Sequence, residues 1–120
     1  MENKNLKNDL IQFTGTEHYY RYYDLLLTDG AYYLAEKAAC FWLMDAIWAH
    51  AHSERWLSKE DFITCKLSVC NSMGELTFDD GNRNILASQH IPYTDFPLDT
   101  IQLFIVRQET QFVVMLPGEY

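Results

Sequence analysis

The sequence predicts one α+β domain over residues 1–120, in which an antiparallel sheet of about five or six strands packs against a central buried helix with short N-terminal helices. Three observations lead to this fold class. Ala38–Ser53 is apolar around nearly the whole helical circumference, which is typical of a buried helix. Phe62–Val69 alternates apolar and polar residues, as a half-buried strand does. Two further apolar runs, Thr100–Gln108 and Gln111–Leu116, are joined by a short turn.

The segment before the central helix is expected to hold two short helices and a hairpin. Asn5–Phe13 places its large apolar residues three and four positions apart, which favours an amphipathic helix. Thr16 is suited to cap a second helical segment, Glu17–Tyr23, although tyrosines also favour strands. Asp29-Gly30 stands between two apolar runs and therefore predicts a hairpin turn.

The chain after residue 61 is expected to form the sheet. Strands are predicted at Phe62–Val69, Glu75–Asp79, Asn84–Pro92, Thr100–Gln108 and Gln111–Leu116. Turn chemistry separates them at Asn71–Gly74, Asp79–Asn82 and Glu109-Thr110. The last two strands carry apolar residues on both faces, so they are expected near the middle of the sheet, or one face of the sheet meets a partner.

Charge limits the function classes that fit this chain. The formal net charge is −8, and Glu75–Tyr120 carries seven acidic residues against only Arg83 and Arg107. Binding to a nucleic-acid backbone requires lysines and arginines that displace counterions, so direct nucleic-acid binding is not expected. An acidic surface instead favours a protein partner that is basic, and a homodimer stays open as a further form of association.

The compartment is expected to be the cytoplasm. The opening segment Met1–Leu10 is polar and lacks the apolar core of a secretory signal. No apolar stretch approaches the roughly 20 residues that span a bilayer, so no membrane association is expected. The three cysteines are an odd number in a chain without an export signal, which favours reduced thiols.

Asp45 and His52 are the strongest candidates for catalysis. They lie seven residues apart, on one face of the predicted central helix, and Trp48 between them could raise the pKa of the carboxyl group. No motif places a nucleophile beside them. The alternative is a buried, structural aspartate whose carboxylate is satisfied by a tyrosine hydroxyl, an indole N–H or a backbone amide, and this reading is favoured.

Neither a metal ion nor another cofactor is expected. Cys65 and Cys70 fall on opposite faces of a predicted strand, Cys40 lies in the helix, and no pair of cysteines or histidines has zinc-ligand spacing. Asp79, Asp80 and Asn82 resemble part of a calcium loop, but the spacing and the final glutamate of that motif are missing. A solvated turn explains these acids better.

Two groups of residues are candidates for contact with a protein partner. The tyrosines around Arg21 are of a type enriched at interfaces, although half of them are expected to pack inward. The acidic residues after position 74 could imitate phosphates toward a basic cleft, or simply form a solvated face. The predicted partner-binding residues are Tyr19, Tyr20, Tyr22, Tyr23, Glu75, Asp79, Asp80, Asp95 and Asp99.

Four blocks of the chain carry a family resemblance: "FTGTEHYYR", "LLLTDGAYYLAEKAACFWLMDAI", "DDGN" and "IPYTDFPLDTIQLF". Their order, from Phe13 to Phe104, resembles an uncharacterised family of small bacterial proteins that is known as a domain of unknown function and occurs in mobile elements. The resemblance implies an intracellular bacterial or phage setting and brings no catalytic residues with it. "HAHSERWLSKEDF", residues 50–62, departs from the pattern.

Together these features favour a non-enzymatic protein that acts by binding another protein. The sharper hypothesis is a phage or mobile-element factor that uses its acidic surface to inhibit a host nucleic-acid-handling defence complex, as an anti-CRISPR protein does. The alternatives are a small enzyme that uses Asp45 and a histidine, and an oligomeric scaffold without chemistry.

Overall fold

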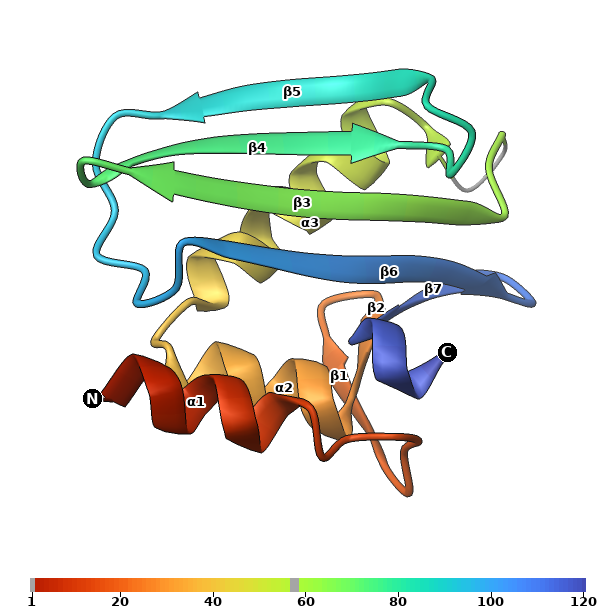
Figure 1. Cartoon of the computed structure of the whole chain (residues 1–120). Coiled ribbons are helices and arrows are strands. Elements are labelled where there is room, and N and C mark those ends of the chain that lie inside the picture. Colours follow the sequence, from red (N-terminus) through yellow and green to blue (C-terminus); the bar gives the residue numbers. More distant parts are fainter. Residues whose placement is uncertain (1, 57–58) are drawn as a thin grey trace.

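The computed structural model describes residues 2–56 and 59–120, which form a seven-stranded mixed sheet and three α-helices within this part of the chain (Figure 1). No helix in the described ranges is long and apolar enough to cross a membrane. The elements in chain order are α1 (Glu2–Leu10), β1 (Tyr19–Tyr22), β2 (Leu25–Thr28), α2 (Asp29–Lys37), α3 (Phe41–Ser53), β3 (Phe62–Cys70), β4 (Met73–Asp79), β5 (Ile85–Ile91), β6 (Thr100–Gln108), β7 (Gln111–Met115) and the 3₁₀ turn η2 (Pro117–Glu119).

The sheet corrects the predicted fold class, because it is neither purely antiparallel nor limited to five or six strands. The strand order is β1-β2-β7-β6-β3-β4-β5, and β2 runs parallel to β7 while every other pair is antiparallel. Leu25–Leu27 lies beside Phe112–Val114, so β2 and β1 extend the sheet beyond the last hairpin. The two extra strands come from the tyrosine- and leucine-rich segment between α1 and α2.

The predicted second helix, Glu17–Tyr23, is wrong: most of this segment is strand β1. Its side chains alternate, so that Tyr20 and Tyr22 face the helices and Tyr19 and Arg21 face away. Tyr20 stacks on Tyr32 of α2 with ring centroids 4.3 Å apart. The preference of tyrosine for strands, with every second ring packed inward, outweighs the helical reading.

The predicted hairpin turn at Asp29-Gly30 is also wrong, because these residues begin helix α2. Thr28 is the N-cap, and its hydroxyl accepts a hydrogen bond from the Ala31 amide at 3.2 Å. Leu34 and Ala35 then follow Ala31 at helical spacing and are fully buried. A turn dipeptide starts a hairpin only when a strand follows it, and the following segment has helical periodicity.

The central helix exists as α3, but it begins three residues later than predicted and is buried along one face only. Ala39 has a positive φ of 51° and separates α3 from α2. Leu43, Met44 and Ile47 are fully buried beneath the sheet, which α3 crosses in Figure 1. Asp45 on the other side of the helix is exposed, so an apolar composition alone overstated the burial of this helix.

The five strands predicted after residue 61 are confirmed as β3 to β7 within small shifts of their ends. In β3, Ile63, Cys65 and Leu67 point to the buried side, as the alternation predicted. Strands β6 and β7 lie near the middle of the sheet, which agrees with their apolar residues on both faces.

The three cysteines are expected to differ sharply in reactivity. All three thiols are free; Cys40 and Cys65 are buried, whereas Cys70 is exposed. Burial raises the pKa of Cys40 to about 12 and raises that of Cys65 as well, so both stay protonated and unreactive at neutral pH. A thiol reagent should therefore label one cysteine quickly in the native protein and three in denaturant without reductant. Fast labelling of two or more in the native protein would contradict this burial.

Candidate protein-binding surface

The two-residue turn between β1 and β2 packs against the exposed side of α3 and forms a surface rich in aromatic rings and carboxylates. Tyr23 and Asp24 form the turn. Helix α3 contributes side chains three or four residues apart, which lie together along its exposed side. This aromatic–acidic surface consists of six residues: Tyr22, Tyr23, Asp24, Asp45, Trp48 and His52.

Asp24 joins the turn to the helix. Its carboxylate accepts a hydrogen bond from the indole N–H of Trp48 at 2.7 Å and lies 2.9 Å from Nε2 of His52. Partial burial opposes ionisation of Asp24, but the bonds from His52 and Trp48 outweigh it and hold the pKa of this carboxyl below its usual value. Asp24 is therefore a carboxylate at neutral pH, with half of its side chain still exposed to solvent.

Asp45 is held by a tyrosine. The hydroxyl of Tyr22 donates a hydrogen bond of 2.6 Å to Oδ1 of Asp45, and this bond raises the pKa of Tyr22 to about 12. The carboxylate is exposed, and no described residue donates to its second oxygen, Oδ2. The surface thus presents two carboxylates that can accept further hydrogen bonds from a partner.

Tyr23 is the most unusual residue of the surface. Its φ is 55°, in the left-handed region that glycine and asparagine normally occupy in two-residue hairpin turns. A bulky side chain in that region costs about 1–2 kcal/mol. Yet the ring is 64% exposed, with contacts to Trp48 at 5.3 Å and Tyr22 at 5.0 Å between centroids. The ring contacts hold Tyr23 in place, and most of its surface remains open to a partner.

Asp45→Asn is expected to leave the fold intact and to lower the pKa of Tyr22 toward its ordinary value of about 10. The raised pKa means that this bond stabilises the fold fully below pH 10, and its contribution is lost as the pH rises toward 12. Because Asp45 is exposed, the substitution should cost about 1 kcal/mol or less at pH 7. Ring-carbon NMR of Tyr22 during a pH titration measures the shift, with Tyr93 as an exposed reference. An unchanged pKa of Tyr22 would contradict the bond.

The candidate catalytic pair, Asp45 and His52, does not form in the structure. His52 bonds to Asp24, and Asp45 bonds to Tyr22, so the two residues of the proposed acid–imidazole pair have separate partners. The structural reading of Asp45 agrees with the geometry in its donor, a tyrosine hydroxyl, but the expected burial is wrong, because Asp45 is exposed. Sequence reasoning missed Asp24; its place in the turn between two strands was the available signal.

The predicted tyrosines divide between the two sides of β1. Tyr22 and Tyr23 belong to the aromatic–acidic surface, and Tyr20 stacks inward on Tyr32. Tyr19 is half exposed and points to the other face of the sheet. The expectation that some rings pack inward while others face solvent therefore agrees with the geometry.

The predicted acidic residues are spread along the sheet. The turn that carries Asp79 and Asp80 lies at the opposite end of the sheet from the β5–β6 connection, which carries Asp95 and Asp99 (Figure 1). Glu75 is four residues from Asp79 on β4, roughly 13 Å along the strand. The five residues thus form separate groups.

Several of these acids also have local partners. Asp80 accepts hydrogen bonds from the Asn82 amide and from the Asn84 side chain, both at 2.8 Å, and Asp79 accepts one from the Gly81 amide at 2.8 Å. The bonds from Asn84 and Asn82 lower the pKa of Asp80. Glu75 pairs with His90 on β5. This network agrees with the solvated-turn reading of the calcium-like segment.

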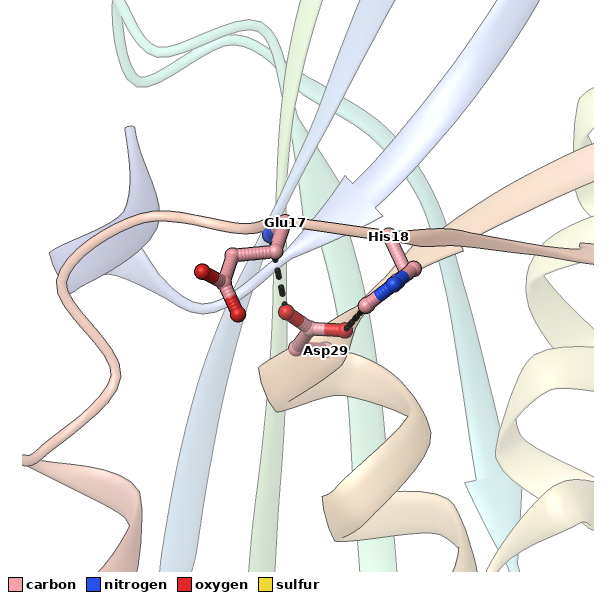
Figure 2. Close-up of side chains that lie close together, drawn as sticks. All are labelled: Glu17, His18 and Asp29. Atoms are coloured by element: carbon pink, nitrogen blue, oxygen red, sulfur yellow. Dashed lines mark hydrogen bonds and ion pairs between the residues drawn. The ribbon is translucent and has the colours of Figure 1, made fainter.

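Glu17, His18 and Asp29 are a further group that sequence reasoning missed, and their ligand atoms all lie within 4.8 Å of one another (Figure 2). Asp29 accepts a hydrogen bond from the Glu17 amide at 2.8 Å and pairs with His18 at 3.8 Å, as the dashed lines of Figure 2 show. Thr16 accepts one from the Asp29 amide at 2.8 Å. The group fastens the preceding loop to the start of α2, where the helix dipole disfavours a cation. We assign it a structural role.

Comparison with known proteins gives one match. The model of a family described as "Family of unknown function (DUF6876)" matches residues 4–120. No curated protein and no solved structure matches the chain.

Proposed function

The chain belongs to the DUF6876 family of unknown function, and we propose that it is a non-enzymatic protein-binding factor whose aromatic–acidic surface receives a cationic segment of a partner protein. The strained and exposed Tyr23 beside Trp48 is the single observation that carries this proposal. Tyrosine and tryptophan are the side chains most enriched among residues that dominate binding energy.

The chemistry of the surface favours arginine or lysine as the recognised group. A guanidinium or ammonium group is attracted to the faces of tyrosine and tryptophan rings, by about 0.5–2 kcal/mol. Asp24 and Asp45 add carboxylate oxygens beside those rings. An arginine that stacks on a ring while donating hydrogen bonds to a carboxylate uses both features at once.

The acidic charge of the whole chain supports the same class of partner. A net charge of −8 attracts a basic protein over several ångströms and speeds encounter, without contributing much to the final contact. Proteins that handle nucleic acids carry arginine- and lysine-rich clefts. A host defence complex of this kind, met by a factor of a phage or mobile element, is the partner that we propose.

A defined peptide tests the proposal without knowledge of the natural partner. The probe is a twelve-residue peptide with four arginines in a glycine–serine background, compared by calorimetry with the same peptide in which citrulline replaces arginine. We expect saturable binding of the arginine peptide alone, weakening as salt is raised from 50 to 300 mM because exposed charges are screened. Equal binding of both peptides, or binding of neither, would refute the proposal.

Tyr23→Gly is expected to separate folding from binding. Glycine adopts the positive φ of residue 23 at no steric cost, so the melting temperature should stay the same or rise. Loss of the exposed ring should lower the affinity for the arginine peptide roughly tenfold, which corresponds to about 1.4 kcal/mol of binding free energy. Calorimetry and thermal unfolding measure the two effects. A large fall in melting temperature would show instead that Tyr23 serves the fold.

The alternative function, a small enzyme, rests on the Asp24–His52 pair. A histidine oriented by a carboxylate is a common general base, and the structure pairs His52 with Asp24 where the sequence pointed to Asp45. Among residues 2–56 and 59–120, however, Asp24 is the only residue to which the His52 imidazole is hydrogen-bonded. Any activity that disappears in His52→Gln at an unchanged melting temperature would favour the enzyme.

A further inference from the structure

A cavity of about 590 Å³ lies on another part of the molecule, between α1 and the first residues of β6. Leu10, the last residue of α1, and Ile11, which follows it, form one wall. Leu98 and the first residues of β6 belong to another, and the start of η2 lines one end. At that end, Gly118 lies so near Phe13 that a Cβ at residue 118 would come within 2.8 Å of the Phe13 carbonyl oxygen. The volume of the cavity is in the range of sites that hold small organic ligands.

The charges around the cavity differ from those of the rest of the chain. Lys7 of α1 and Lys66 of β3 line it, and among the side chains that the structure describes no acidic one does, although the chain has a net charge of −8. No ion pair joins either lysine to another residue in the described ranges. The nearest acids on the adjacent strand β4 are Glu75 and Asp79, which bond to His90 and to the Gly81 amide.

The exposed apolar surface at this place is unusual as well. Ile11 is 76% exposed, the largest exposure among the big apolar side chains of the described residues. It stands on the cavity rim one turn beyond Lys7, whose aliphatic stem adds to the same wall. An apolar hollow lined by two lysines is complementary to a ligand that has an apolar chain and an anionic head.

We propose that this cavity binds a straight-chain carboxylate, with the alkyl chain against Ile11 and Leu98 and the carboxylate beside Lys7 and Lys66. The carboxylate would accept charge-assisted hydrogen bonds from the two ammonium groups, and Thr100 and Gln102 provide further polar contacts at the same wall. The cavity shares no residue with the aromatic–acidic surface, so binding of a carboxylate here is independent of the proposed function.

Dodecanoate, below its micelle concentration, is the probe that tests the site by calorimetry. We expect saturable binding of one molecule per chain, weakened roughly tenfold for each two methylene groups removed in decanoate and octanoate. Dodecyltrimethylammonium has the same tail and the opposite charge, so it should bind at least tenfold more weakly. Equal affinity for the two amphiphiles would overturn the proposal, as would binding of anionic lipid vesicles without binding of monomeric dodecanoate.

Substitutions at the cavity supply the matched controls. Lys7→Gln combined with Lys66→Gln should lower the affinity for dodecanoate at least tenfold. Lys37→Gln, which removes one positive charge from α2, should leave that affinity unchanged. Ile11→Ser should lower the affinity for dodecanoate severalfold and leave the melting temperature unchanged, because this side chain is already exposed. Unchanged affinity in both cavity variants would place any binding elsewhere and refute the assigned site.

Discussion

Glu119→Ala is expected to lower the free energy of unfolding by about 2–4 kcal/mol, as it removes a carboxylate that accepts three hydrogen bonds. The donors are the Thr28 hydroxyl at 2.6 Å, the Gly30 amide at 2.9 Å and the Leu116 amide at 2.9 Å. Two of these donors belong to the first turn of α2 and its cap, where helix amides otherwise lack partners. Urea unfolding of the variant and the wild type measures the loss.

Gly30→Ala probes the same contact from the other side. A Cβ at residue 30 would lie 2.5 Å from Oε1 of Glu119 and 2.6 Å from Leu116, so the carboxylate would have to move and lose its bonds. Alanine should therefore destabilise the wild type but cost less in a chain that already carries Glu119→Ala. Glu36→Ala, an exposed glutamate of the same helix, is the control and should change stability by less than about 0.5 kcal/mol. A similarly small effect of Glu119→Ala would contradict its role as the cap of α2.

Trp48→Ala is expected to weaken binding of the arginine peptide by about 30-fold or more, corresponding to about 2 kcal/mol. The substitution removes the ring beneath Tyr23 and also the N–H that orients the Asp24 carboxylate. Trp48→Phe keeps a smaller aromatic ring and loses the N–H, so it should weaken peptide binding by a smaller factor. Calorimetry with the arginine peptide measures both variants.

Trp42→Phe serves as the matched control for Trp48, because it changes another indole of the same helix that packs against the core. It should leave peptide affinity unchanged. If Trp48→Ala binds like the wild type at an intact fold, the aromatic–acidic surface is not the recognition site.

The strands after residue 61 could be predicted because their signal is local. Ile63, Cys65 and Leu67 alternate with polar residues, and that alternation alone decides which face is buried. The start of α2 could not be read in the same way. Asp29-Gly30 is a turn dipeptide, and part of what satisfies its backbone comes from Glu119, about 90 positions further along the chain.

The candidate surface could also be predicted only where the signal is local. Tyr22 and Tyr23 were predicted as partner-binding residues from their composition, and the structure leaves Tyr23 widely exposed. Asp24 and Trp48 could not be joined from sequence, since their hydrogen bond spans 24 positions and depends on how α3 packs beside the β1–β2 turn. Net charge likewise predicted an acidic character but could not show that Asp79 and Asp99 lie at opposite ends of the sheet.

An NMR titration of the ¹⁵N-labelled chain with the arginine peptide shows which residues the peptide contacts. The three tryptophan indoles give separate reporters, of which Trp48 alone belongs to the aromatic–acidic surface. We predict saturable shifts of the Trp48 indole and of the Tyr23 and Asp24 amides, with Trp42 and Trp56 unchanged. The account would be contradicted if the peptide left these signals in place, or if its largest shifts fell on the acidic residues between Glu75 and Asp99.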